Sequence, residues 1–107
     1  MKMARYQVVV SLLPELFEKF ERKRLNSLGK EVIKEVLSMG ESCLIDVPSG
    51  VVEELCKKAT VRKKFYVDKK TYLRWKSIPM IFKRWAFYWI NKKLQEAAKV
   101  EHEGVKG

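Results

Sequence analysis

The sequence has few of the residues on which catalysis and metal binding most often depend. Its 107 residues include one histidine, His102, and two cysteines, Cys43 and Cys56. The cysteines fit neither a zinc spacing nor a disulfide framework, so we interpret them as buried thiols, with a single disulfide as the alternative. No glycine-rich phosphate loop and no carboxylate pair at catalytic spacing stands out. We therefore expect no enzymatic activity, no cofactor and no metal.

Long apolar runs are also missing. No stretch approaches the roughly 18 apolar residues of a membrane span, and the N-terminal residues MKMARYQ lack the apolar segment of a signal peptide. We expect a cytoplasmic protein without a membrane partner. Asn and Gln are scarce whereas Lys and Glu are abundant, which is the compositional bias of thermophile proteins.

The positive charge is concentrated in the second half of the chain. Residues 1–54 contain 8 Lys and Arg against 9 Asp and Glu, whereas residues 55–107 contain 15 against 4, and the whole chain has a formal charge of +10. Such an asymmetry favours a polyanionic partner, nucleic acid before an anionic membrane. A solvated, lysine-rich thermophile surface is the alternative.

The hydrophobic period changes near the start of the chain. Apolar side chains fall on every second position of residues 5–12, which predicts a strand with Tyr6, Val8, Val10 and Leu12 on one face. After Pro14, three- and four-residue spacing predicts a helix to about Arg24. Asn26 or Ser27 can cap a second helix that ends near Gly40. The first unit therefore reads strand, helix, helix.

The same order returns 55 positions later. Residues 62–67 predict a strand, Asp68 an N-cap for a helix over 69–76, and Pro79 the start of a long helix to about Ala98. A shift of 35 gives a competing match, but its third element is weaker. The predicted organisation is a first unit at 1–40, a strand-plus-helix connection at 41–60, a second unit at 61–98 and a flexible tail at 99–107.

A strand followed by two helices cannot close its own core, because the strand has no partner. Two chains solve this by pairing their N-terminal strands antiparallel, which leaves one ribbon face outside; such a ribbon fits a DNA major groove. Residues 5–39 resemble the ribbon-helix-helix DNA-binding proteins of the Arc, MetJ and CopG type. The resemblance implies base reading by the outward strand residues and phosphate binding at the start of the second helix. The corresponding positions are Arg5, Gln7, Val9 and Ser11 for bases, and Ser27, Leu28, Gly29 and Lys30 for phosphate.

The whole chain is similar to the tandem ribbon-helix-helix transcription regulators of archaeal filamentous viruses, which would place it in a host cell. In the second ribbon the outward residues are Arg62, Lys64 and Tyr66. The expected fold is mainly α with short β, dimerising through N-terminal strands into a homodimer or higher even oligomer. The expected function is sequence-specific double-stranded DNA binding in transcription regulation. Alternatives are a DNA-coating or architectural protein, an antitoxin-like interaction module, a strand that only dimerises the chain, and a solvated basic loop at 62–64.

The helix over residues 81–90 contains five aromatic side chains within nine residues. Its apolar arc is wider than one neighbouring element covers, so we expect burial on two sides. Base stacking on exposed tryptophans and a helix lying in a membrane interface are the competing interpretations.

Overall fold

A computed structural model of the chain describes residues 6–40, 47–58 and 60–105. These residues form five helices and a two-stranded antiparallel sheet, which confirms a mainly helical fold with short β structure. The elements in chain order are β1 (Tyr6–Leu12), α1 (Glu15–Lys19), α2 (Arg22–Met39), α4 (Ser49–Lys57), β2 (Val61–Val67), α5 (Lys69–Ser77) and α6 (Met80–Val105). Strand, helix and helix therefore follow one another twice, with α4 between the two series.

The two strands pair with each other along their full length. Tyr6 lies opposite Val67 and Leu12 opposite Val61. The strands predicted over 5–12 and 62–67 are thus confirmed over 6–12 and 61–67, with residue 5 outside the described part of the chain. The expectation that the N-terminal strand pairs with its copy in a second chain is corrected, because the partner of β1 is β2 of the same chain. The entropic cost of closing the chain between Leu12 and Val61 grows only slowly with its length. Because β2 is tethered to β1, its effective concentration is high, which favours pairing within the chain.

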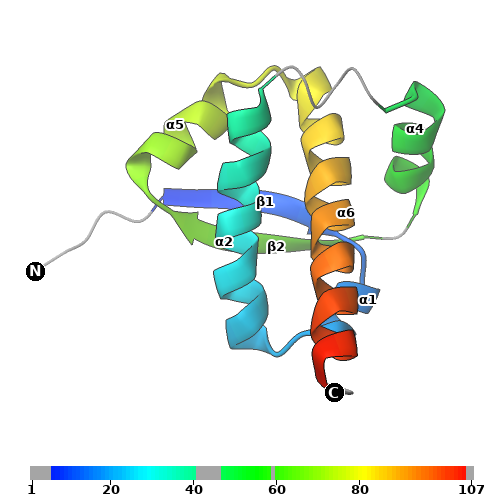
Figure 1. The fold of residues 1–107 in the computed structure, drawn as a ribbon. Coiled ribbons are helices and arrows are strands. Elements are labelled where there is room, and N and C mark those ends of the chain that lie inside the picture. Colours follow the sequence, from blue (N-terminus) through cyan, green and yellow to red (C-terminus); the bar gives the residue numbers. More distant parts are fainter. Residues whose placement is uncertain (1–5, 41–46, 59, 106–107) are drawn as a thin grey trace, which may run out of the picture.

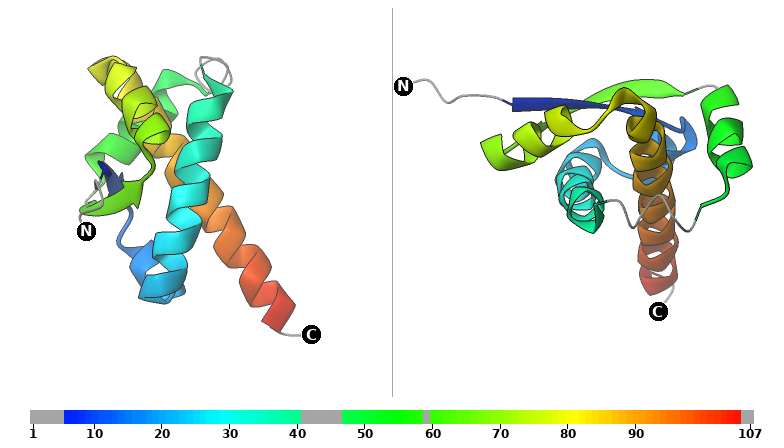
Figure 2. Two further views of the ribbon diagram at one scale, coloured as in Figure 1. Left: turned by 90° about the vertical axis from the view of Figure 1, so that its left-hand side faces the viewer. Right: turned by 90° about the horizontal axis from the view of Figure 1, so that it is seen from above.

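The helices cover one face of this ribbon. In Figure 1, α2 and α6 run in opposite directions in front of the strands, and Figure 2 shows the ribbon as a layer of its own at one side of the molecule. Helix α4 packs against α6. The core between the layers is built from Val8, Val10, Leu12, Leu16, Phe20, Leu25, Val32, Ile33, Val36, Phe65, Trp75, Ala86, Ile90, Leu94 and Ala98.

The first two helices meet earlier than the sequence predicts. Helix α1 ends at Lys19, and α2 begins at Arg22 instead of being capped by Asn26 or Ser27. The backbone is extended at Phe20 and Glu21, and the Phe20 side chain is buried in the core. Anchoring this aromatic ring fixes the bend, and the helix restarts directly after it.

The other helices follow the predicted boundaries, except that α6 is longer than expected. Helix α2 ends at Met39, and its C-cap is Gly40, whose φ of 60° suits glycine. Helix α4 confirms the helix expected within the 41–60 connection. Helix α6 continues to Val105, so the backbone over residues 99–105 of the predicted tail is helical. Cys56 is exposed instead of buried. The strand expected at the start of the 41–60 connection lies almost wholly outside the described residues, and Cys43 lies outside them altogether.

The aromatic helix α6 is buried along one side and partly covered along the other. Ala86, Ile90, Asn91, Leu94 and Ala98 are buried on α6, which packs against α2 and β1, while α4 contacts it as well. The ring of Phe87 stacks on Trp75 of α5 at 5.7 Å between centroids. The N-terminal end is more open, since Met80 and Ile81 are exposed. No helix among the described residues is long and apolar enough to cross a membrane.

Candidate nucleic-acid interface

The uncovered face of the ribbon presents three side chains from each strand. The antiparallel register sets Gln7 opposite Tyr66, Val9 opposite Lys64, and Ser11 opposite Arg62. All six side chains are exposed or half-buried, whereas the alternate positions of β1 point into the core. The structure thus brings the outward residues predicted for both strands onto one surface. The remaining predicted position, Arg5, lies outside the described residues.

This surface, which we call the ribbon face, has a chemistry suited to a polyanion. It carries two cations, Arg62 and Lys64, and neither strand contains an acidic residue. Arginine can donate to the O6 and N7 atoms of guanine, glutamine can pair with adenine, and an apolar side chain such as that of Val9 can contact a thymine methyl group. Hydroxyl and amide groups serve bases or phosphates. The ribbon face therefore combines cations that can bind phosphates with side chains that can contact base edges.

A buried amide holds one end of β1 to α6. The Asn91 side chain accepts a hydrogen bond from the Leu13 backbone N–H at 2.9 Å. Its Nδ2 donates to the backbone oxygens of Ser11, at 2.9 Å, and Phe87, at 2.8 Å. Since Asn91 is only 2% exposed, these bonds are made away from water. They fix the strand end that carries Ser11 to the helical layer.

Close backbone packing supports the other strand. Gly29 faces the ring of Phe65, and a Cβ atom at that position would lie 2.1 Å from Cε1 of the ring. Phe65 is fully buried opposite Val8. Because position 29 has no side chain, α2 can approach β2 closely. This close packing holds the middle of β2 in place and thereby supports the ribbon face.

Residues 27–30, the predicted phosphate-binding positions, do not lie at the start of the second helix as expected. Because α2 begins at Arg22, these residues lie inside the helix, where backbone N–H groups bond to carbonyl oxygens one turn earlier. Gly29 is also buried. The free N–H groups belong to the first turn, which begins with three basic residues, Arg22, Lys23 and Arg24. Arg24 is already engaged with Glu101 of α6, at 2.5 Å.

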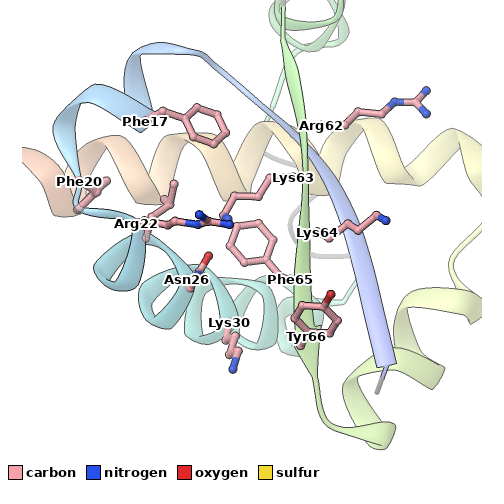
Figure 3. A pocket seen from close by; sticks show the side chains of 11 residues that line it. Phe17, Phe20, Arg22, Asn26, Lys30, Arg62, Lys63, Lys64, Phe65 and Tyr66 are labelled. Carbon is pink, nitrogen blue, oxygen red and sulfur yellow. The ribbon is translucent and has the colours of Figure 1, made fainter. Parts of the chain in front are cut away.

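A cavity of about 670 Å³ opens between β2, α1 and the first half of α2. Figure 3 shows the Arg22 and Lys63 side chains extending toward one another across it, above the Phe65 ring. Its described lining consists of Phe17, Phe20, Arg22, Leu25, Asn26, Lys30, Arg62, Lys63, Lys64, Phe65 and Tyr66. Three of these residues, Arg62, Lys64 and Tyr66, also belong to the ribbon face, so the two surfaces are continuous.

Lys63 is the unusual residue of this cavity. It occupies an inward-facing position of β2 and is half-buried, with its Nζ atom 5.3 Å from the centroid of the Phe65 ring. Burial, and secondarily the charge of Arg22, lowers the pKa of Lys63. Neither Lys63 nor Arg22 is among the site residues predicted from the sequence. The signal was the alternation itself, because positions 61, 65 and 67 of the same face are apolar and Lys63 interrupts them.

The described residues contain no group of three or more His, Cys, Asp or Glu side chains placed to hold a metal ion. Asp68 stands at the N-cap position of α5, as predicted, but its carboxylate accepts a hydrogen bond from the Thr71 hydroxyl instead of capping the backbone. This bond is the main cause of a lowered Asp68 pKa.

No protein-family model matches the chain, and no match was found among curated proteins or solved structures.

Proposed function

We propose that the chain is a double-stranded DNA-binding transcription regulator that inserts its two-stranded ribbon into the major groove. The observation that carries the proposal is the β1–β2 register, which sets Gln7, Val9 and Ser11 directly opposite Tyr66, Lys64 and Arg62. A two-stranded ribbon matches the width of the major groove, and six adjacent side chains can then meet base edges.

The arrangement also supports a ribbon-helix-helix relationship. In that family two chains each contribute one strand and two helices; here the same order occurs twice in one chain, and the two strands pair antiparallel. A single copy therefore contains both strands of a ribbon. By the same resemblance, phosphate contacts belong to the first turn of α2, at Arg22 and Lys23, instead of residues 27–30.

Electrostatics supplies the remaining argument. The second half of the chain carries 15 basic against 4 acidic residues, and it contributes β2 with Arg62 and Lys64. Cations that contact phosphates release counterions, so binding should weaken steeply as salt rises. The Arg62 and Lys64 side chains set affinity in this scheme, while Gln7, Val9 and Ser11 add base discrimination.

The test is a competition gel shift at about 150 mM salt, near physiological ionic strength. Labelled duplex from upstream of the protein's own gene is challenged with unlabelled random duplex. We expect strong preference for the upstream duplex, and we expect Gln7→Ala to reduce that preference without changing the salt dependence. Equal competition by random duplex would reject a sequence-specific regulator and favour a DNA coat.

A matched pair of variants tests the ribbon face itself. Arg62→Ala with Lys64→Ala should weaken binding to all duplexes and reduce the slope of log K against log salt by about 1 to 2. Lys57→Ala with Lys99→Ala removes the same charge from exposed positions on α4 and α6 and should have a smaller effect. Equal losses in the two double variants would mean that the ribbon face is not the binding surface.

A further inference from the structure

The cavity beside β2 has the size of a small-molecule site. Its volume of about 670 Å³ falls within the roughly 300–1,000 Å³ typical of ligand pockets. Its walls come from α1, α2 and β2, which are joined through the hydrophobic core. The site is therefore built on regular elements that packing holds in place.

The charge of this cavity is unbalanced. Five cationic residues line it, and none of its described lining residues is acidic; they are Arg22, Lys30, Arg62, Lys63 and Lys64. Figure 3 shows the side chains of Arg62 and Lys64 extending to the other side of β2, so the cations that face one another across the cavity are Arg22 and Lys63. Arg22 and Lys63 converge in Figure 3, and neither forms an ion pair with a carboxylate in the part of the chain that the structure describes. Burial disfavours the charged form of Lys63, and the nearby positive charge of Arg22 disfavours it further. An anion bound between the two side chains would offset both the burial of the charge and the repulsion.

The cavity also offers a flat apolar surface. Phe17 of α1 is 37% exposed and lines the cavity together with Arg22 and Lys63. The side-chain amide of Asn26 belongs to the α2 wall and can donate or accept hydrogen bonds. An inorganic anion alone would use the cations but not the ring. A ligand that combines a phosphate with a planar, polar ring would use the cations, the Phe17 ring and the Asn26 amide together.

We propose that this cavity binds a small phosphorylated ligand of nucleotide size, with its phosphate between Arg22 and Lys63 and its ring against Phe17. Because Arg62, Lys64 and Tyr66 line both the cavity and the ribbon face, a bound ligand would compete with DNA. That regulatory consequence rests on the function proposed above, whereas the ligand site itself does not.

The experiment is isothermal titration calorimetry of the full chain, without DNA, using adenosine 5′-monophosphate as the probe. Adenosine and inorganic phosphate serve as its two halves. We expect the nucleotide to bind at least about ten times more tightly than either half, because each half raises the effective concentration of the other. Equal affinity for the nucleotide and for phosphate would overturn the ring contact and with it the proposal.

Variants assign the binding to named side chains. Lys63→Met keeps the aliphatic stem and should weaken nucleotide binding about 10- to 100-fold, the range for one hydrogen bond to a charged group. Phe17→Leu should weaken binding of the nucleotide but not of phosphate. Lys19→Met is the matched control, since Lys19 is exposed at the end of α1 and does not line the cavity. Wild-type affinity in Lys63→Met, or equal losses in both lysine variants, would refute the site.

Two further measurements keep the outcomes distinct. In the wild-type chain, backbone amide shifts on nucleotide addition should centre on Arg22, Asn26 and Lys63; shifts confined to other elements would overturn the proposal without any variant. Displacement of bound duplex by the nucleotide would support competition with DNA. Nucleotide binding that leaves duplex affinity unchanged would remove the regulatory consequence alone, and failure of duplex binding would count only against the proposed function.

Discussion

Replacing Gly29 with alanine should destabilise the chain, although the same change is favourable in an open helix. The added Cβ atom would lie 2.1 Å from Cε1, 2.7 Å from Cζ and 2.8 Å from Cδ1 of Phe65. Phe65 is only 1% exposed, so neighbouring groups surround most of its ring. Either the ring must shift toward the cavity that it lines or α2 and β2 must move apart, and movement of β2 displaces the ribbon face.

Two opposing contributions set the size of the effect. Alanine is favoured over glycine in a helix interior by about 1 kcal/mol, whereas overpacking a core costs about 1–3 kcal/mol and occasionally more. A separation of 2.1 Å lies far inside the roughly 3.5–4.0 Å at which carbon atoms attract, which puts the cost at the upper end. We expect a net loss of about 2 kcal/mol, or a Tm lower by roughly 10 °C for a domain of this size.

The assay is urea unfolding monitored by circular dichroism. It is carried out as a double-mutant cycle that combines Gly29→Ala with Phe65→Leu. In the Phe65→Leu background the alanine at position 29 has room, so we expect it to be neutral or stabilising, with a coupling of about 2–3 kcal/mol. Gly50→Ala is the control, because nothing lies within 4 Å of a Cβ atom built there. A Gly29→Ala midpoint at or above that of the wild type would refute the close approach of α2 to β2.

Two other changes probe the support of the ribbon. Asn91→Leu leaves the Leu13 N–H and the Ser11 carbonyl without their side-chain partner, so we expect a loss of about 3 kcal/mol, at roughly 1–3 for each buried group; urea midpoints measure it, and an unchanged midpoint would contradict the anchoring role. Lys63→Met should raise stability in the absence of ligand, because burial and the Arg22 charge lower the pKa of Lys63. The unfolded chain binds more protons between the lowered pKa and the ordinary lysine value, so wild-type stability should rise with pH across that window. Lys63→Met should lose this rise, and an identical pH profile in both proteins would disprove the assignment.

Both strands of the ribbon could be predicted from the sequence, because the alternation of apolar and polar residues within each strand shows which side chains are buried. Alternation at every second position told which side chains of β1 point inward, and the structure confirms it at Val8, Val10 and Leu12. The same pattern located β2. What the pattern could not supply was the identity of the partner strand, because antiparallel pairing within one chain and between two chains buries the same faces.

The helix junction was missed for a different reason. Asn26 and Ser27 have the side chains of N-caps, and local propensity favours a break there. The structure instead breaks the chain at Phe20, whose ring is buried, and tertiary packing outweighs a cap worth about 1 kcal/mol. The predicted phosphate positions moved with the junction. The cavity needed three elements to come together, and the sequence marked only one of its residues, Lys63, as a charge among the apolar inward positions of β2.

A ribbon made by one chain has a consequence that a ribbon made by two copies lacks. Two identical strands present identical outward residues, so their preferred DNA site shares the two-fold symmetry of the protein. Here β1 presents Gln7, Val9 and Ser11, whereas β2 presents Arg62, Lys64 and Tyr66. If the ribbon enters the groove as proposed, the two halves of the site meet different chemistry, and the preferred sequence should not be a palindrome. Selection of bound duplexes from a random pool measures this directly: a palindromic consensus centred on the ribbon would show that two copies of one strand, and not β1 with β2, contact the bases.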